Sequence, residues 1–233
     1  MAQEAGRTAL VAGGSGLVGS RLLARLLEAG EYARVQAISR RPLPLDHPRL
    51  ANRVVRFDGG LDSQLKGLQC QDAFCCLGTT IREAGSQQAF RAVDHDLVLQ
   101  FARLALTSGA ERLVVVSSIG ADPKSRNFYL RVKGETEQGL VALKPRALDI
   151  MAPSMLLGVR RNVRPLEQLA QGLIWLVNPL LLGGLAQYRG IAADTVAAAM
   201  LGAARGGRRG VNRYTFQDMR ALAASAVRNS SRL

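Results

Sequence analysis

The chain has 233 residues, 48% of them hydrophobic, which suffices for one domain with a buried sheet and excludes a disordered chain. Its formal net charge is +13, from 31 Lys and Arg against 18 Asp and Glu, yet the arginines are scattered and no basic stripe with interleaved aromatic residues is present. We therefore interpret the charge as an arginine-rich, solvated surface, with a nucleic-acid partner as the disfavoured alternative.

Apolar runs of strand length alternate with amphipathic helical stretches, the pattern of a parallel sheet with helices on both faces. We predict strands at residues 8–12, 35–39, 54–57, 73–76, 113–116, 147–151 and 212–214. We predict helices at residues 17–29, 86–106, 129–143, 166–176, 193–204 and 216–226. The expected fold is α/β, a single Rossmann-type domain over residues 1–233 with a doubly wound parallel sheet. Residues 153–190 break the alternation and are expected to cover a substrate.

A glycine-rich turn follows the first predicted strand, in the sequence LVAGGSGLVG at residues 10–19. Gly13 permits a tight turn, Gly16 lets backbone N–H groups approach a pyrophosphate, and Gly19 lets the following helix pack closely on the strand. The positive end of that helix then faces the phosphates. The alternative is a structural turn that binds nothing. We assign dinucleotide binding here to Gly13, Ser15, Gly16, Leu17 and Val18.

The end of the second predicted strand indicates which dinucleotide binds. An NAD site places a carboxylate there to accept from the ribose 2′-hydroxyl. This chain has Ser39, Arg40 and Arg41 instead, and a guanidinium can hold a 2′-phosphate. NADP(H) is therefore favoured over NAD(H), unless both arginines simply point to water. Asp58, after the third predicted strand, could accept from the adenine amino group or could only form a turn.

A serine, a tyrosine and a lysine form the candidate catalytic set. Ser118 follows the strand at 113–116, and Tyr129 and Lys133 lie four residues apart, on one face of a predicted helix. A phenol with a pKa of about 10 is a poor base, but an adjacent ammonium favours its ionised form. Tyr129 can then exchange a proton with a substrate oxygen that Ser118 also binds, while Lys133 also holds the cofactor ribose.

Four further motifs connect these residues to a known family: FCCLGTT at 74–80, VDHDLVL at 93–99, LVVVSSIGAD at 113–122 and FYLRVKGETE at 128–137. With the glycine turn, they resemble the short-chain dehydrogenase/reductase superfamily and, within it, an atypical branch similar to the Tat-interacting oxidoreductase-like group. The resemblance spans residues 8 to 160. It implies an NADP(H)-binding Rossmann fold, Ser118, Tyr129 and Lys133 as catalytic residues, and relatives linked to regulation through partner proteins.

The chain departs from the superfamily pattern at two places. The fourth strand ends in CCLGT at residues 75–79 rather than in Asn-Asn-Ala-Gly, although the backbone of Leu77, Gly78 and Thr79 can still line the cofactor. Asp94 stands where many relatives carry a catalytic asparagine, and we assign it a supporting role. Pro153 is expected to border the nicotinamide, as a proline does at this point in similar enzymes.

These observations favour an NADP(H)-dependent oxidoreductase that acts on a small, rather apolar carbonyl compound, because the expected substrate-covering segment is rich in apolar residues. Two alternatives stay open. One is an NADPH-binding regulatory or interaction protein with little catalysis, and the other is an epimerase or dehydratase of a sugar nucleotide. The helices at 86–106 and 129–143 could also form a homodimer interface.

The remaining residues bear on location and on metals. Cys70, Cys75 and Cys76 offer no disulfide framework, and no basic stretch followed by an apolar run opens the chain, so we expect a cytoplasmic protein. His47 and His95 are too isolated to suggest a metal site. The most apolar stretch, at 173–185, is too short to span a bilayer.

Overall fold

The computed structural model describes residues 6–57, 60–65, 67–158 and 187–230. The helix predicted at 166–176, most of the expected substrate-covering segment and Asp58 lie outside these residues.

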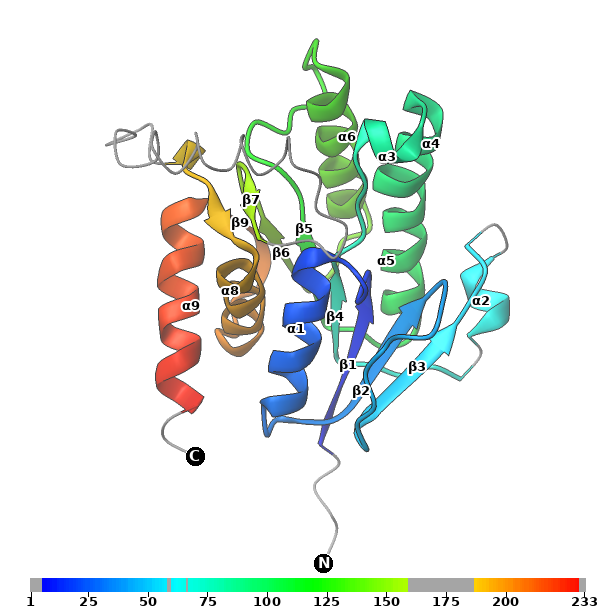
Figure 1. Cartoon of the computed structure of the whole chain (residues 1–233), viewed down its shortest axis with the longest axis vertical. Helices are drawn as coiled ribbons and strands as arrows, with labels where there is room; N and C mark the ends of the chain where they lie inside the picture. Colours follow the sequence, from blue (N-terminus) through cyan, green and yellow to red (C-terminus); the bar gives the residue numbers. More distant parts are fainter. Residues whose placement is uncertain (1–5, 58–59, 66, 159–186, 231–233) are drawn as a thin grey trace, which may run out of the picture.

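A seven-stranded, wholly parallel sheet forms the centre of the fold, in the order β3-β2-β1-β4-β5-β6-β9 (Figure 1). The first six strands follow the order typical of dinucleotide-binding Rossmann domains, so the predicted fold class is confirmed. A small parallel pair, β7 with β8, lies apart from this sheet. The strands are β1 (Arg7–Ala12), β2 (Tyr32–Ser39), β3 (Leu50–Val54), β4 (Asp72–Cys75), β5 (Arg112–Val116), β6 (Ala147–Met151), β7 (Leu156–Leu157), β8 (Ile191–Ala192) and β9 (Gly210–Tyr214).

Helices cover both faces of the sheet (Figure 1). One face carries α1 (Leu17–Glu28), α8 (Ala193–Arg205) and α9 (Phe216–Ser230). The other carries α5 (Val98–Thr107) and α6 (Phe128–Ala142), with the short α2 (Leu61–Gln64) beside them. The short α3 (Ile81–Ala84) and α4 (Gln87–Arg91) lead into α5 through a π-helical segment, η1 (Ala92–Leu97).

Residues alternate between the two faces along the central strand. Ala9 and Val11 of β1 belong to the core under α1 and α8, whereas Leu10 and Ala12 belong to the core under α5. All four side chains are buried. This period of two explains why β1 reads as a continuous apolar run: both of its faces are covered.

The third strand was predicted at the wrong place. It spans Leu50–Val54, whereas the apolar run that suggested a strand at 54–57 begins where the strand ends. β3 is an edge strand that pairs only with β2, and no residue of it is fully buried. Its sequence, LANRV, therefore carries no apolar signal, because an edge strand with solvated faces does not require one.

Candidate functional site

Loops that follow parallel strands gather at the carboxyl edge of the sheet, where ligands of open α/β folds bind. They are the glycine turn after β1, the loop from Ser39 after β2, residues 77–79 after β4, Ser117 and Ser118 after β5, and Pro153 after β6. All the cofactor and catalytic residues predicted within the described chain lie in these loops or at the starts of α1 and α6 that follow them.

Steric contacts at the glycine turn require glycine at two positions. Gly13 has a φ of +81°, and a Cβ there would lie 2.4 Å from the carbonyl oxygen of Cys76. A Cβ on Gly19 would lie 2.1 Å from the carbonyl oxygen of Gly13, so α1 packs directly on the turn. Gly16 begins α1 without a side-chain cap, and the first turn of α1 contains no acidic residue. The free N–H groups of this turn, with Ser15 and Gly16 exposed beside them, fit a diphosphate.

The loop after β2 is held rigid while its arginines stay exposed. The Ser39 hydroxyl donates to the carbonyl oxygen of Arg41 at 2.7 Å, and the Asn52 amide donates to the Ser39 hydroxyl at 2.8 Å. The side-chain oxygen of Asn52 accepts from the N–H of Leu43 at 2.8 Å. The side chains of Arg40 and Arg41 make no hydrogen bond or ion pair within the described chain, so both guanidinium groups are available to a ligand.

Asp94 joins the loop after β4 to α6. Its carboxylate lies 2.7 Å from the Lys133 ammonium and accepts a hydrogen bond of 2.8 Å from the N–H of Thr79. Its backbone carbonyl accepts from the Thr136 hydroxyl of α6 at 3.0 Å. Asp94 and Lys133 are both buried, and Asp94 lies in the π-helical turn η1, a feature that often marks functional sites.

The protonation of Lys133 follows from this pair. Burial by itself would lower the pKa of Lys133, but the facing groups Asp94, Tyr129 and Cys75 outweigh burial and raise it. Lys133 is therefore an ammonium at neutral pH, with Asp94 as its buried counter-charge. A Cβ on Gly78 would lie 3.9 Å from the Lys133 nitrogen, so this ammonium lies close beneath the exposed backbone after β4.

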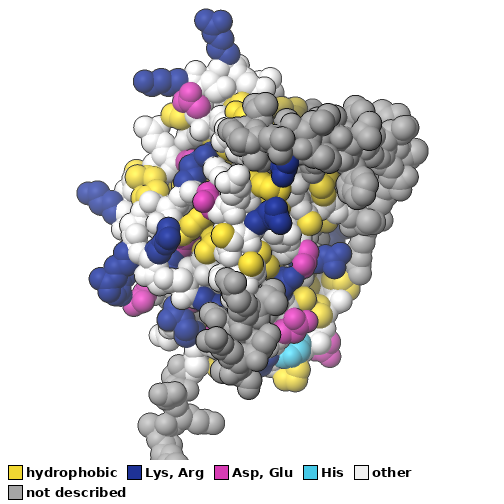
Figure 2. All heavy atoms as spheres, turned by 90° about the vertical axis from the view of Figure 1, so that its left-hand side faces the viewer, with side chains coloured by type: hydrophobic (Ala, Val, Ile, Leu, Met, Phe, Trp, Pro, Cys, Tyr) yellow, Lys and Arg dark blue, Asp and Glu magenta, His cyan; other side chains and the backbone are white. Residues whose placement is uncertain are grey.

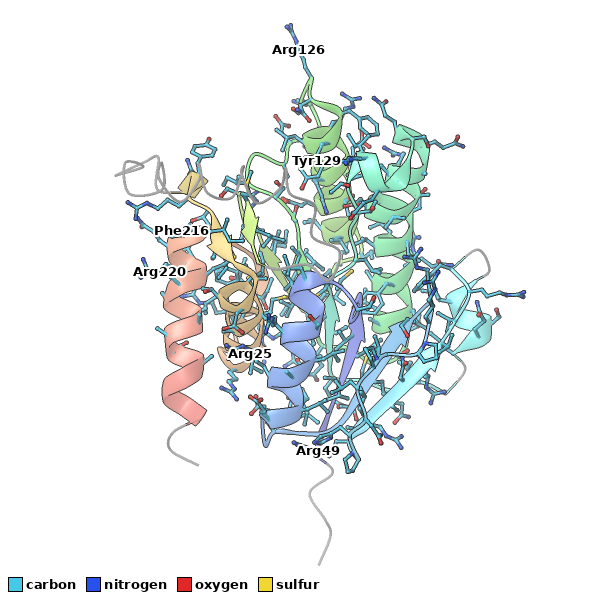
Figure 3. All side chains as sticks on the ribbon, in the orientation of Figure 1. Arg25, Arg49, Arg126, Tyr129, Phe216 and Arg220 are labelled. Carbon is cyan, nitrogen blue, oxygen red and sulfur yellow. The ribbon has the colours of Figure 1, made fainter. Side chains whose placement is uncertain are left out.

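Tyr129 lies in the first turn of α6, one turn before Lys133, and Figure 3 shows it at the end of α6 that adjoins α3 and α4. Its ring packs on the buried ring of Phe90, with centroids 5.6 Å apart. The loop that precedes α6 lies against this helix at Gly134, where a Cβ would be 2.2 Å from the backbone nitrogen of Pro123. Sequence reasoning missed Gly134, which allows the chain to return from Ser118 to Tyr129.

Ser118 is buried at the end of β5. Its hydroxyl contacts the carbonyl oxygen of Ile119 at 3.2 Å, and the N–H of Ile119 donates to the carbonyl oxygen of Pro153 at 2.9 Å. In the described part of the chain, Ser118, Tyr129 and Lys133 form no hydrogen bond to one another. All three residues nonetheless lie at the same edge of the sheet.

The expected substrate-covering segment leaves and returns at this edge. At its first end, β7 pairs in parallel with β8, which begins directly after residue 190. The Ser154 hydroxyl also donates to the carbonyl oxygen of Arg189, near the other end. A Cβ on Gly158 would lie 2.9 Å from the side chain of Leu17, the first residue of α1. Gly158, the last described residue before this gap, therefore lies beside the start of α1, next to the glycine turn.

The described residues show neither a candidate metal site nor a candidate membrane-spanning helix. Over the described ranges, His, Cys, Asp and Glu form no cluster of three or more that could hold a metal ion. Likewise, no helix within those ranges has the length and hydropathy needed to cross a membrane. On the face shown in Figure 2, basic side chains are interspersed with acidic and hydrophobic ones.

The fold and the glycine turn define a dinucleotide-binding protein, and comparison with known families agrees. The model of the NAD dependent epimerase/dehydratase family matches residues 9–129, which is more than half of the chain. The chain therefore belongs to this family.

Two relatives narrow this assignment. The chain is 39% identical over 155 residues to "Protein FMP52, mitochondrial" of Saccharomyces cerevisiae, covering 66% of this chain and 67% of that protein. It is 38% identical over 169 residues to "Protein HTATIP2" of Rattus norvegicus, covering 71% of this chain and 69% of that protein. The predicted resemblance to the Tat-interacting group of atypical short-chain dehydrogenases/reductases is confirmed.

Solved structures support the fold. MoeE5 in complex with UDP-glucose and NAD has a TM-score of 0.67 at 19% identity, covering 94% of this chain and 81% of that one. WbmG of Bordetella bronchiseptica in complex with NAD has a TM-score of 0.67 at 12% identity, covering 98% and 80%. At these identities the likeness concerns the fold alone.

The predicted cytoplasmic location is contradicted. Relatives from several fungi, including Saccharomyces cerevisiae and Coccidioides immitis, carry the name "Protein FMP52, mitochondrial" at 33% to 39% identity. The lack of a disulfide framework does not identify the compartment, because reduced thiols occur in more than one compartment.

Proposed function

We propose that this protein is an NADP(H)-dependent oxidoreductase that acts on a small, rather apolar carbonyl compound through Ser118, Tyr129 and Lys133. The observation that carries the proposal is the position of Lys133, a buried ammonium one helical turn from Tyr129 and directly beneath the exposed backbone at Gly78. The family supports a nicotinamide cofactor, which when bound supplies or accepts a hydride.

Residues of this chain would bind the cofactor and substrate and transfer the proton. The N–H groups at the start of α1 would hold the diphosphate of the cofactor, and Lys133 would donate hydrogen bonds to its ribose. The Ser118 hydroxyl donates to the substrate oxygen, and Tyr129 transfers the proton to or from that oxygen. Pro153 and the ends of residues 153–190 border the reacting centre and limit the access of water.

Substitution of Tyr129 by phenylalanine tests the mechanism, because it keeps the ring against Phe90 and removes only the hydroxyl. We expect NADPH oxidation with a carbonyl substrate found by screening aldehydes and ketones to fall by at least ~10²-fold, with NADPH affinity unchanged. Phe128→Leu, on the same turn, is the control. Equal turnover of the parent and the Tyr129→Phe variant would remove Tyr129 from the mechanism.

Arg40 and Arg41 are proposed to select NADP(H), since both are exposed and unpaired in the described chain on a loop fixed by Ser39 and Asn52. In an Arg40→Ala, Arg41→Ala variant, we expect NADPH affinity to fall by about 10- to 100-fold and NADH affinity to stay constant, as for lost hydrogen bonds to a charged group. Calorimetric titration with each nucleotide measures both affinities.

The matched control for this variant is Arg34→Ala with Arg103→Ala, which removes the same charge at exposed positions away from the loop. An equal loss of NADPH and NADH affinity in the Arg40, Arg41 variant would contradict selection by these arginines. Weakened NADPH binding in the control would show that net charge alone is responsible.

A second candidate function is an NADPH-binding regulatory protein, and one observation favours it. Asp94 offsets the charge of Lys133, so the pair as a whole attracts a phenolate less than a lone ammonium would. This candidate predicts a thermal shift with NADPH but no oxidation of NADPH across carbonyl compounds and UDP-sugars. Turnover of a UDP-sugar with bound NAD would instead favour the epimerase alternative, in keeping with the family.

A further inference from the structure

A bridge of polar side chains reaches the backbone next to Ser118. It has no role in the glycine turn, the cofactor loops or the Ser–Tyr–Lys set. Arg213 of β9 donates to the backbone carbonyl oxygen of Ser118 at 2.8 Å. The same guanidinium donates to the Glu137 carboxylate at 3.2 Å, and the other oxygen of that carboxylate accepts from the Ser117 hydroxyl. The segment after β5, the helix α6 and the strand β9, which is distant from both in sequence, are therefore connected at this one point.

The bridge is partly shielded from water. Glu137 is 15% exposed and Arg213 is 34% exposed, while Ser117 and Ser118 are both buried. Hydrogen bonds in which one partner is charged are shorter and stronger than neutral ones, and shielding from water strengthens them further. The bridge is therefore better suited to fixing a position than an ion pair on the open surface would be.

Glu137 lies on the same helix as the candidate acid–base residues. It follows Lys133 by four residues and Tyr129 by eight, so the three side chains succeed one another along one side of α6. Glu137 thus contacts the Ser118 segment from the helix that also carries Tyr129. Arg213 holds the same segment from β9, which lies beyond β6 in the sheet.

We propose that Glu137 and Arg213 are positioning residues that fix the Ser117–Ser118 segment relative to α6, and so set the spacing between the Ser118 and Tyr129 hydroxyls. This inference rests on the proposed function, in which both hydroxyls contact one substrate oxygen. An error of about 1 Å in such a spacing can lower a rate by ~10²-fold. Neither residue touches the substrate; both act through Ser118.

The hold on the segment is tested by hydrogen exchange, which needs no substrate. In Arg213→Ala we expect the amides of residues 117–121 to exchange at least ~10-fold faster than in the parent, with the glycine turn unchanged. Arg146→Ala is the control, because it removes an arginine from an exposed pair with Glu111 at the opposite edge of the sheet. Unchanged exchange at 117–121 would overturn the inference.

The catalytic consequence is tested by turnover with the carbonyl substrate. We expect Arg213→Ala and Glu137→Gln to lower kcat at least ~10-fold while NADPH affinity stays within about twofold of the parent. Arg213→Lys, which keeps the charge, should recover part of the loss. Arg146→Ala should have parental turnover.

A double variant separates positioning from general stability. If Arg213 acts only through Ser118, Arg213→Ala should have no further effect on kcat in a Ser118→Ala background. Additive losses would overturn the positioning role. If the parent protein shows no turnover, the proposed function is wrong. The hydrogen-exchange experiment then tests on its own whether Arg213 fixes residues 117–121.

Discussion

At the scale of single residues, Asp94 shows what a carboxylate does where similar enzymes carry an asparagine. An amide could also accept from the N–H of Thr79, but only a carboxylate provides a counter-charge for the buried ammonium of Lys133. The sequence identified Asp94 as a departure from the family pattern. It could not indicate the ion pair, because that contact depends on how η1 packs against α6.

Asp94→Asn should lower the free energy of unfolding by about 3 kcal/mol at pH 7, because a buried ammonium loses its partner. In the parent, the raised pKa of Lys133 contributes stability that is present below the lysine's ordinary pKa and is lost only as pH rises through the raised value. In the variant, burial lowers that pKa, so folding becomes more favourable as pH rises. The difference between the two proteins should therefore shrink from pH 7 to pH 9.5, as measured by urea unfolding.

Asp96→Asn is the control, since Asp96 lies on the same helical segment but is 62% exposed and pairs with His95. It should change the free energy of unfolding by less than about 0.5 kcal/mol. A gap between parent and Asp94→Asn that stays constant with pH would contradict the pairing of Asp94 with Lys133.

At the scale of elements, the end of α1 depends on a side chain from outside the helix. The Arg49 guanidinium donates to the carbonyl oxygens of Leu27, Ala29 and Tyr32, at the end of α1 and the start of β2. Figure 3 labels Arg49 near this end of α1. The carbonyl oxygens at the end of a helix have no acceptor role within it and need such outside partners. The charge of Arg49 also suits the negative end of the helix dipole. Arg49 lies just before the edge strand β3, which the sequence placed incorrectly.

Arg49→Ala should lower the free energy of unfolding by about 2 kcal/mol, the value typical of hydrogen bonds to a charged group. Urea denaturation followed by circular dichroism measures this loss, and Arg49→Lys should recover only part of it because an ammonium cannot reach all three acceptors. Arg53→Ala, on the exposed part of β3, is the control. Equal stability of Arg49→Ala and the parent would show that water replaces the guanidinium at no cost.

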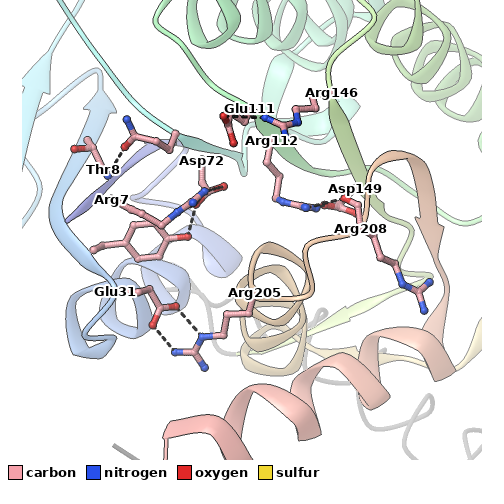
Figure 4. Close-up of polar contacts among 12 residues, drawn as sticks. Arg7, Thr8, Glu31, Asp72, Glu111, Arg112, Arg146, Asp149, Arg205 and Arg208 are labelled. Atoms are coloured by element: carbon pink, nitrogen blue, oxygen red, sulfur yellow. Dashed lines mark hydrogen bonds and ion pairs between the residues drawn. The ribbon is translucent and has the colours of Figure 1, made fainter. Parts of the chain in front are cut away.

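At the scale of the whole molecule, ion pairs gather at the amino edge of the sheet, opposite the candidate site. Arg7 binds Asp72 at the start of β4, and Arg112 binds the fully buried Asp149 of β6 (Figure 4). Asp149 also accepts from the Tyr214 hydroxyl of β9 at 3.1 Å. Burial raises the pKa of Asp149 despite these partners. They connect strands β5, β6 and β9 on the side of the sheet where no ligand is expected.

Tyr214→Phe should make the stability of the protein less sensitive to alkaline pH. Burial and the Asp149 carboxylate raise the pKa of Tyr214 from 10 to about 12. The unfolded chain therefore releases this proton near pH 10 while the folded chain retains it, and the stabilisation present below pH 10 is lost as pH rises to 12.

The Tyr214→Phe variant loses about 1 kcal/mol at pH 7 with the hydrogen bond, but its stability should decline less steeply than that of the parent between pH 10 and 12. Guanidinium unfolding at a series of pH values measures both slopes. Parallel curves for the two proteins would contradict the assignment.

The sequence alone determined the Rossmann fold and the family, because glycines that must fit a turn and apolar runs that must be buried on two faces are required locally. Only the tertiary structure decided the edge strand β3, the pairing of Asp94 with Lys133 and the bridge from Arg213 through Glu137 to the Ser118 segment. Helical periodicity from Lys133 could have placed Glu137 on the same side of α6, but no local pattern could have placed Arg213 beside Glu137. A contact between residues 95 positions apart is set by the order of strands in the sheet, and no local pattern records that order.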